Sequence, residues 1–301
     1  MALDSLQAYS DQLAATVAKV AHSTARVDAR NGVPGAGIVW SADGVIVTAD
    51  HVIEREENIR VELEGGTYDA ELAGRDPNTD LAVLRVKGAT PVAADIAGPQ
   101  TLKAGHLVIA VARPWGDTVA SAGIVSSIGQ FDAGQRWGEQ FREGLVNAEL
   151  TLYPGFSGGP LADASGRVVG MNTSGPGQRM RIAIPSETIA RVAAELLKEG
   201  RIKHGFLGIG VQKIPLAQAL GEKLALKQET ALMVLTVEAG SAAEKGGFFP
   251  GDILVGLGDE TIARVRELHR WLGTARPGQQ VQARVIRGGE IKELSVTIGE
   301  R

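Results

Sequence analysis

The amino-acid sequence predicts a mostly β protein with two β-rich units and an N-terminal helix. Short apolar runs separated by Gly, Asp, Asn and Pro fill most of the chain, which is the pattern of many short strands. The 39 glycines suit a turn-rich protein. The length of 301 residues corresponds to about two domains of roughly 100–200 residues each. With 44% hydrophobic and 22% charged residues, the chain can bury large cores.

The N-terminal stretch predicts an amphipathic helix over residues 4–21. Asp4, followed by Gln7, resembles a helix start signal. Apolar residues then recur at helical spacing at Leu6, Tyr9, Leu13, Val17 and Val20. The stretch has no basic segment followed by a continuous apolar core, so it does not resemble a signal peptide. We therefore expect a cytoplasmic location, or an extracytoplasmic one if a leader has been removed.

The first β-rich unit extends from Arg26 to Ile184. Its short apolar runs are GIVW, VIVTA, IRVEL, LAVLRV, LVIAVA, VVGMN and RIAIP. Their number and spacing favour antiparallel barrels or a sandwich.

A helix is expected next, over the segment ETIARVAAELLKE. Ser186 is placed to cap its start and Gly200 to end it. Its apolar face contains Ile189, Val192, Leu196 and Leu197. A second β-rich unit follows, with one helical stretch, ARVRELHRWLG. The predicted organisation is an N-terminal helical segment (1–23), the first β unit (24–185), a linker helix (186–204) and the second β unit (205–301).

Composition excludes several classes of function. The chain has no cysteine, which excludes disulfides, a thiol nucleophile and a cysteine metal site. The net charge of −4, with Lys and Arg scattered, argues against nucleic acid as the main partner. No apolar run approaches the roughly 20 residues needed to span a membrane. We expect neither a metal nor another cofactor.

The segment LYPGFSGGPL surrounds Ser157 with three glycines and two prolines. Glycine permits positive φ and close approach of the backbone. A serine hydroxyl becomes a nucleophile only with a base to take its proton, a group to orient that base and donors for the oxyanion. The alternative interpretation is a glycine-rich turn between strands in which the serine is incidental.

Two further residues supply the missing chemistry. His51 ends an apolar strand in VIVTADHVI, and Asp80 precedes another strand in DPNTDLAVLRV. Taken singly, they can be a partly buried strand histidine and a turn acid. Together with Ser157 they give the order His, Asp, Ser, which is associated with chymotrypsin-type barrels. The remaining histidines lie in helical or surface-like contexts: His22, His106, His204 and His269.

The segments TADHV, TDLAVL and GFSGGPL resemble those of the HtrA/Deg family of trypsin-like serine proteases. The likeness runs from GAGIVWSADGVIVTADHV through RIAIPS. It implies a chymotrypsin-like pair of perpendicular six-stranded barrels, the first carrying His51 and Asp80 and the second Ser157. It also implies that Ser157 is the nucleophile, His51 the general base and Asp80 its orienting partner. The backbone N–H groups of Gly155 and Ser157 would form the oxyanion hole.

The second unit resembles the PDZ domain that follows the protease in that family, in GFLGIGV and GSAAEKGGFFPGDILVGLGDETI. A PDZ groove adds a peptide to a sheet edge and holds its C-terminal carboxylate with backbone amides. The resemblance implies a carboxylate loop of Gly205, Phe206, Leu207 and Gly208. Leu207, Ile209 and Val211, at strand period, would then face the helical residues Val265, Leu268 and Leu272. The alternative is a plain β-turn with core aliphatics.

The family resemblance implies an ATP-independent serine endopeptidase that degrades unfolded or damaged proteins, with PDZ binding of peptide C-termini. The alternative is a non-cleaving, peptide-binding or chaperone-like scaffold, and Phe156 is the feature that lends it weight. An esterase has little support, because nothing outlines an enclosed acyl pocket. The family forms trimers through its N-terminal segment, so Tyr9 is a candidate contact in a homotrimer. The helix can equally pack on its own barrel.

Substrate preference is expected to be aliphatic. Relatives that cleave after Arg or Lys have an acid six residues before the nucleophile, where this chain has Thr151. The expected walls of the pocket are apolar: Leu152, Ile182, Ala183 and Ile184.

Phe156 stands directly before the nucleophile, where most relatives have Asn. Phenylalanine cannot hydrogen-bond through its side chain and can only bury apolar area. We expect it to pack behind the loop and to anchor the Pro154–Gly155 peptide. The alternative is that it only fills core space.

Overall fold

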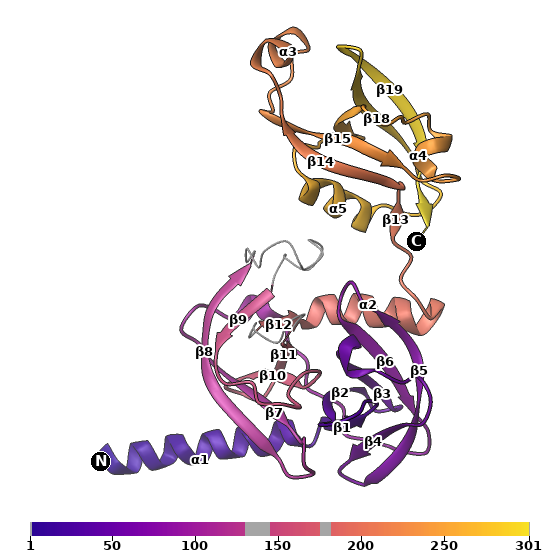
Figure 1. Cartoon of the computed structure of the whole chain (residues 1–301). Coiled ribbons are helices and arrows are strands. Elements are labelled where there is room, and N and C mark those ends of the chain that lie inside the picture. Colours follow the sequence, from indigo (N-terminus) through magenta and orange to yellow (C-terminus); the bar gives the residue numbers. More distant parts are fainter. Residues whose placement is uncertain (1, 130–144, 175–181, 301) are drawn as a thin grey trace. The chain divides into compact units, whose positions relative to one another are not determined.

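The computed structural model describes residues 2–129, 145–174 and 182–300, and the side chains of the first helix from residue 5 onward. The chain divides into two compact units, Met1–Ile202 and Lys203–Arg301. Figure 1 shows that strands dominate both units. Among the described residues, no helix is both long and apolar enough to cross a membrane.

The first six strands close into a barrel. They are β1 (Thr24–Asp28), β2 (Gly35–Ser41), β3 (Val45–Thr48), β4 (Ile59–Leu63), β5 (Gly66–Asp76) and β6 (Leu81–Val86). Their order is β1-β2-β3-β6-β5-β4, and antiparallel pairing of β1 with β4 closes the barrel. A short 3₁₀ turn, η1 (Asp50–Val52), follows β3, and another, η2 (Pro99–Thr101), precedes the second barrel.

A second six-stranded barrel follows in the same unit. It contains β7 (Leu107–Ala112), β8 (Val119–Gly129), β9 (Leu145–Glu149), β10 (Pro160–Asp163), β11 (Val168–Thr173) and β12 (Ile182–Pro185). Their order is β10-β11-β12-β9-β8-β7, and β10 pairs with β7 to close the barrel. The two closed barrels and the N-terminal helix confirm the predicted fold class.

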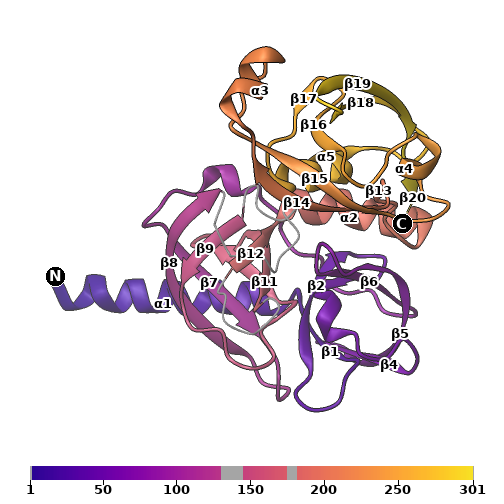
Figure 2. The same cartoon turned by 45° about the horizontal axis from the view of Figure 1, so that its top comes forward.

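The N-terminal helix α1 (Ala2–Ala21) begins two residues before Asp4, so Asp4 is not its cap. Val20 and the half-buried Val17 pack against Ile109 of β7 and other apolar residues of the second barrel. Leu6 and Tyr9 are 65% and 49% exposed. Figures 1 and 2 both show the first part of α1 extending beyond the second barrel.

The linker helix α2 (Ser186–Glu199) ends at Gly200, whose φ of +74° gives the expected left-handed C-cap. The prediction that Ser186 caps its start is wrong. Ser186 is the first helical residue, and its Oγ donates to the Ala97 carbonyl at 2.6 Å instead of to the helix. Three residues of the predicted apolar face, Ile189, Val192 and Leu196, are fully buried against first-barrel residues, and Leu197 packs at the edge.

The second unit contains an antiparallel sheet in the order β14-β15-β16-β18-β19, so β14 is an edge strand. These strands are β14 (Ile209–Pro215), β15 (Thr230–Val237), β16 (Ile253–Leu257), β18 (Gln280–Arg287) and β19 (Glu290–Thr297), and β17 (Glu260–Thr261) pairs with β16. A separate pair joins β13 (Gly205–Phe206) to β20 (Gly299–Glu300).

The sequence predicted one helix in this unit, which is α5 (Val265–Thr274). The structure adds α3 (Gln218–Lys223) and α4 (Ala242–Lys245). With six and four residues, they are too short to display helical periodicity. The domain boundaries at residues 24, 186 and 205 stay a prediction.

Candidate active site

His51 and Asp80 come together at one end of the first barrel. His51 lies in η1, directly after β3, and Asp80 directly precedes β6. His51 Nδ1 lies 2.8 Å from Asp80 Oδ1 and 3.0 Å from Oδ2. A carboxylate only accepts hydrogen bonds, so Nδ1 carries the proton and Nε2 is left as the basic nitrogen.

Asp80 is held by several contacts besides the imidazole. Its φ is +49°, in the left-handed region that Asp tolerates better than most residues. Its Oδ1 accepts the His51 backbone N–H at 3.1 Å, and its Oδ2 accepts the Thr173 hydroxyl at 2.6 Å. Its side chain is 11% exposed. These contacts fix the carboxylate facing the imidazole.

The segment before Ser157 forms a tight turn. The Phe156 N–H donates to the Tyr153 carbonyl at 3.1 Å, and Pro154 and Gly155 occupy the centre. Gly155 has φ of +92°, so this is a type II pattern, with proline second and glycine third.

A second turn of the same kind carries Ser157. The Gly159 N–H donates to the Phe156 carbonyl at 3.0 Å, and Gly158 has φ of +90°. The Ser157 carbonyl accepts the Ala36 N–H of β2 at 2.9 Å. A Cβ on Gly158 would overlap the Ala36 carbonyl. Glycine here therefore lets the serine turn lie against the first barrel, which carries His51.

The two predicted oxyanion donors, the N–H groups of Gly155 and Ser157, have no acceptor among the described residues. Both residues are buried. Buried N–H groups are nearly always paired, so two without a partner in adjacent turns are suited to binding an anion. Their assignment to an oxyanion hole stays a prediction. A Cβ on Gly155 would lie 2.6 Å from Pro114 Cβ and 2.9 Å from the Pro34 carbonyl oxygen, so the turn tolerates only glycine there.

The Ser157 hydroxyl itself faces a neighbour that the sequence analysis missed. Its Oγ lies 3.1 Å from Ser174 Oγ and accepts the Ser174 N–H at 3.4 Å. Across the described residues, it makes no hydrogen bond to His51. Ser174 and Thr173 end the apolar run VVGMN, and this polar pair at a strand end was the only signal of them in the sequence.

Phe156 is 1% exposed and belongs to the apolar core of the second barrel. The same cluster includes Leu161 of β10 and Val108 of β7. The Tyr153 ring lies 5.8 Å away, centroid to centroid. Phe156 thus connects the turn at Gly155 to the barrel interior.

The four residues predicted to line the substrate pocket divide into two sets. Leu152 packs against the same second-barrel cluster as Ala183. Ile182 and Ile184 belong to another cluster, with first-barrel and α2 residues, because successive residues of a strand face opposite sides. All three β12 residues are buried. Their assignment to a substrate pocket stays a prediction.

The residues predicted to bind a peptide gather in the second unit. Leu207 and Leu268 are buried in one apolar cluster, with Ile209, Val211, Val265 and Leu272 at its border. Gly205 and Phe206 form β13, and Gly208 has φ of +80°. The Leu207 and Gly208 N–H groups find no acceptor within the described residues.

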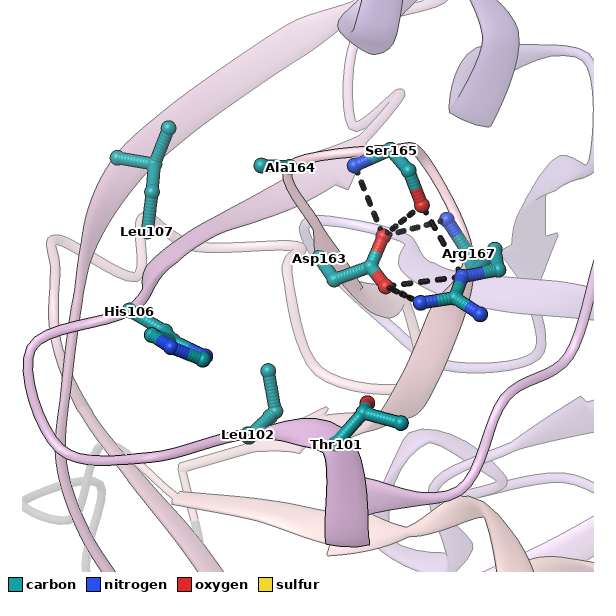
Figure 3. A pocket seen from close by; sticks show the side chains of 8 residues that line it. All are labelled: Thr101, Leu102, His106, Leu107, Asp163, Ala164, Ser165 and Arg167. Atoms are coloured by element: carbon teal, nitrogen blue, oxygen red, sulfur yellow. Dashed lines mark hydrogen bonds and ion pairs between the residues drawn. The ribbon is translucent and has the colours of Figure 1, made fainter.

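A surface pocket of the second barrel lies at the β10–β11 turn and contains none of the predicted site residues. Figure 3 shows Asp163 in its wall, bonded to Ser165 and Arg167. Burial raises the pKa of Asp163, but these hydrogen bonds outweigh it and hold the pKa below its ordinary value. In the described ranges, no group of His, Asp and Glu is arranged to hold a metal ion.

Comparison with known protein families finds two matches. Residues 35–171 match the trypsin-like peptidase domain, and residues 205–298 match the PDZ domain. The second match confirms the PDZ part of the fold class.

Individual proteins agree with these matches. A probable periplasmic serine endoprotease DegP-like of Ectopseudomonas mendocina is 32% identical over 272 residues, covering 88% of this chain and 56% of the relative. The protein of the same name from Brucella suis is 34% identical over 274 residues, covering 88% and 52%. The chain therefore spans about half the length of the curated relatives that it matches.

A solved structure, the HtrA-type protease AlgW with decapeptide, superimposes with a TM-score of 0.80 at 26% identity, covering 96% of this chain and 98% of that one.

The expectation of a cytoplasmic location is wrong. The curated relatives are named periplasmic, which points to an extracytoplasmic location. The N-terminal residues offered only an absence of signal-peptide features, and such an absence does not identify a compartment.

A trypsin-like peptidase domain followed by a PDZ domain is also what the names of the similar proteins and the superimposed structure lead us to expect, and the arrangement of His51, Asp80 and Ser157 agrees with it. This chain belongs to the HtrA/Deg family of trypsin-like serine endoproteases that carry a PDZ domain.

Proposed function

We propose that this protein is a serine endopeptidase that cleaves unfolded or damaged proteins without ATP. The observation that carries the proposal is that the N–H groups of the buried residues Gly155 and Ser157 have no acceptor among the residues that the structure describes, while His51 is already bonded to Asp80. These parts supply an oxyanion site and an oriented base, which acyl transfer from a peptide bond needs.

In the proposed reaction, His51 Nε2 takes the Ser157 proton as Oγ attacks the scissile carbonyl carbon. The N–H groups of Gly155 and Ser157 stabilise the oxyanion, and Asp80 stabilises the imidazolium. His51 then protonates the leaving amine, and water hydrolyses the acyl-enzyme by the same steps. The hydroxyl must leave Ser174 for His51 before attack, so substrate binding has to favour that rotation.

Hydrolysis of unfolded casein tests the proposal. Ser157→Ala should lower the rate by about 10⁴-fold or more, because the three residues act as a unit. Its thermal midpoint should stay close to that of the unchanged protein. A stably folded parent protein without activity would favour the alternative, a peptide-binding scaffold. Equal cleavage by Ser157→Ala would refute the role of Ser157.

We propose that cleavage follows small to medium aliphatic residues. Thr151 provides no negative charge for a basic side chain, and Leu152 and Ala183 are apolar members of one cluster. Mass spectrometry of casein fragments tests this. A map dominated by Arg or Lys on the amino side of the cleaved bonds would overturn it.

We propose that the PDZ domain binds peptide C-termini. The N–H groups of Leu207 and Gly208, which have no acceptor in the described part of the chain, are suited to a carboxylate, and the edge strand β14 can pair with an added strand. Fluorescence anisotropy of an apolar-ended peptide should show weaker binding when its carboxylate is amidated. Equal binding of both forms would contradict the carboxylate role.

We also propose that the exposed Leu6 and Tyr9 of α1 contact further copies of the chain, forming a homotrimer. Exposed apolar side chains on a projecting helix are suited to burial in an interface. Light scattering should then give about three times the chain mass of 31.5 kDa, and Tyr9→Glu should lower it. A monomer at micromolar concentration would reject the trimer.

A further inference from the structure

The residue directly before the proposed base is a buried carboxylate with an arginine partner. Asp50 begins η1, and its side chain is 11% exposed. Arg75 Nε donates to Asp50 Oδ1 at 2.5 Å, and Arg75 Nη2 donates to the Asp50 carbonyl oxygen at 3.4 Å. One guanidinium therefore contacts both the side chain and the backbone of the residue next to His51.

Arg75 stands on the hairpin that carries Asp80. It is the second-last residue of β5 and pairs with Ala82 of β6. Asp76 follows it and organises the connecting turn, because its Oδ2 accepts the Thr79 hydroxyl at 2.6 Å. The backbone of Arg75 is thus fixed relative to Asp80, and the guanidinium of Arg75 holds the segment that contains His51.

A second set of bonds joins the same two segments. The Asp50 N–H donates to the Asp80 carbonyl at 3.0 Å, and the His51 N–H donates to Asp80 Oδ1 at 3.1 Å. Any movement of Asp50 therefore changes how the His51 ring faces the carboxylate. A buried carboxylate that loses its cation is costly and tends to move toward water. The hydrogen bond that Arg75 donates to Asp50 raises the pKa of Arg75, as expected for a tight ion pair.

We propose that Arg75 is a positioning residue for the base, and that it acts through Asp50 to keep His51 Nδ1 facing the Asp80 carboxylate. Its kinetic consequence rests on the proposed function, but its geometric consequence does not. Arg75 also lies 3.3 Å from Glu56, whose side chain is 64% exposed, so that contact contributes little.

The first test observes the hydrogen bond itself. The His51 Nδ1 proton, shared with a carboxylate, should give a far-downfield proton NMR signal. His22 also contacts a carboxylate, Glu64, so the signal is assigned by its loss in His51→Gln. Spectra are recorded in a Ser157→Ala background to prevent self-cleavage. We expect Arg75→Gln and Asp50→Asn to weaken or remove the signal, and Arg75→Lys to retain part of it.

The second test is kinetic. With Ser157 intact, Arg75→Gln should lower kcat on a fluorogenic peptide by about 10–100-fold, the effect of displacing a catalytic group by roughly 1 Å. KM should stay within about twofold, because Arg75 acts on the base and not on the bound peptide. The double variant with Asp50→Asn should lose little more than either single variant, because both remove one interaction.

Arg167→Gln is the matched control. Arg167 donates to Asp163 Oδ2 from Nε at 3.0 Å and from Nη2 at 2.8 Å, and the Asp163 side chain is also 11% exposed (Figure 3). This pair lies in the β10–β11 turn, apart from η1. Its loss should lower the thermal midpoint and leave the His51 signal and kcat unchanged.

The inference is overturned if Arg75→Gln keeps the His51 signal, or loses no more kcat than Arg167→Gln. If Arg75→Gln does not fold, the His51 NMR signal and kcat of Arg75→Lys and Asp50→Asn are compared with those of Arg167→Gln instead. If the unchanged protein cleaves nothing, the proposed function fails, and the NMR comparison still decides the role of Arg75.

Discussion

The two halves of the candidate site are held by different kinds of interaction. On the first barrel, His51 and Asp80 are fixed by directional polar contacts, including the Thr173 hydroxyl on the carboxylate. On the second barrel, the turn that carries Ser157 is fixed by glycine geometry and by the buried Phe156 ring. The Ser157 hydroxyl is not bonded to the base and contacts Ser174 instead.

This difference follows from what each half must do. An imidazole can rotate, so its proton position has to be set by hydrogen bonds. Backbone N–H donors have no rotatable side chain, so a rigid turn packed on a core is enough to aim them. The polar half should therefore be sensitive to loss of charge, and the apolar half to loss of volume.

The largest expected effect breaks the polar half. Asp80→Asn keeps a residue that tolerates positive φ, so the backbone at +49° is preserved. An amide no longer stabilises the imidazolium or selects the Nδ1–H tautomer. Steady-state kinetics on a fluorogenic peptide should show kcat lower by roughly 10³–10⁴-fold. A loss below about tenfold would mean that Asp80 does not orient the base.

A smaller effect should follow from breaking the apolar half. Phe156→Ala removes the buried ring that follows the Pro154–Gly155 peptide. The Gly155 N–H should then no longer be held in the direction of the oxyanion. We expect kcat to fall by about 10²-fold, comparable to losing one oxyanion donor, with the His51 NMR signal unchanged. The same truncation should cost roughly 3–5 kcal/mol of folding free energy.

Because this loss of folding free energy can unfold Phe156→Ala, two further variants are measured beside it. Phe156→Leu keeps most of the apolar contact and should retain most of kcat. Val108→Ala removes volume from the same apolar cluster but at a residue of β7, outside the turn segment, and should lower stability without lowering kcat. If Phe156→Ala is folded and fully active, Phe156 only fills the core.

The smallest expected effect is on stability, from the Arg167–Asp163 ion pair of the second barrel. The pKa of Asp163 is lower in the folded state than in the unfolded chain, so the ionised carboxylate stabilises the fold. This stabilisation is fully present above the unfolded pKa of about 3.9 and is lost as the pH falls through the folded pKa. Asp163→Asn should therefore lower the thermal midpoint by a few degrees at pH 7. The difference should shrink below about pH 4. A difference that is constant from pH 7 to pH 3 would contradict the linkage.

Much of the fold could be predicted from the sequence, because strand patterns and glycine turns are local. The runs that became β3, β6 and β11 were each bounded by turn residues. The left-handed cap at Gly200 was visible for the same reason. By contrast, Ser186 failed as a cap because its hydroxyl bonds to Ala97, 89 residues away, and a local pattern does not carry that information.

The site shows the same limit. His51, Asp80 and Ser157 could be found because each stands in a distinctive segment. Thr173, Ser174 and Arg75 could not, because their importance comes from neighbours that are distant in the chain. Ile182 and Ile184 pack in a different apolar cluster from Ala183, because alternate residues of a strand face opposite sides. This arrangement should have been anticipated from the sequence.

If Ser157 is an activated nucleophile, a reagent that forms a covalent bond with such serines should label it. The intact protein is incubated with a fluorophosphonate probe, digested, and mapped by mass spectrometry, with Ser157→Ala and Ser174→Ala in parallel. We expect one adduct, on Ser157, that is absent in Ser157→Ala and present in Ser174→Ala. No adduct on the folded protein, or an adduct that persists in Ser157→Ala, would contradict it.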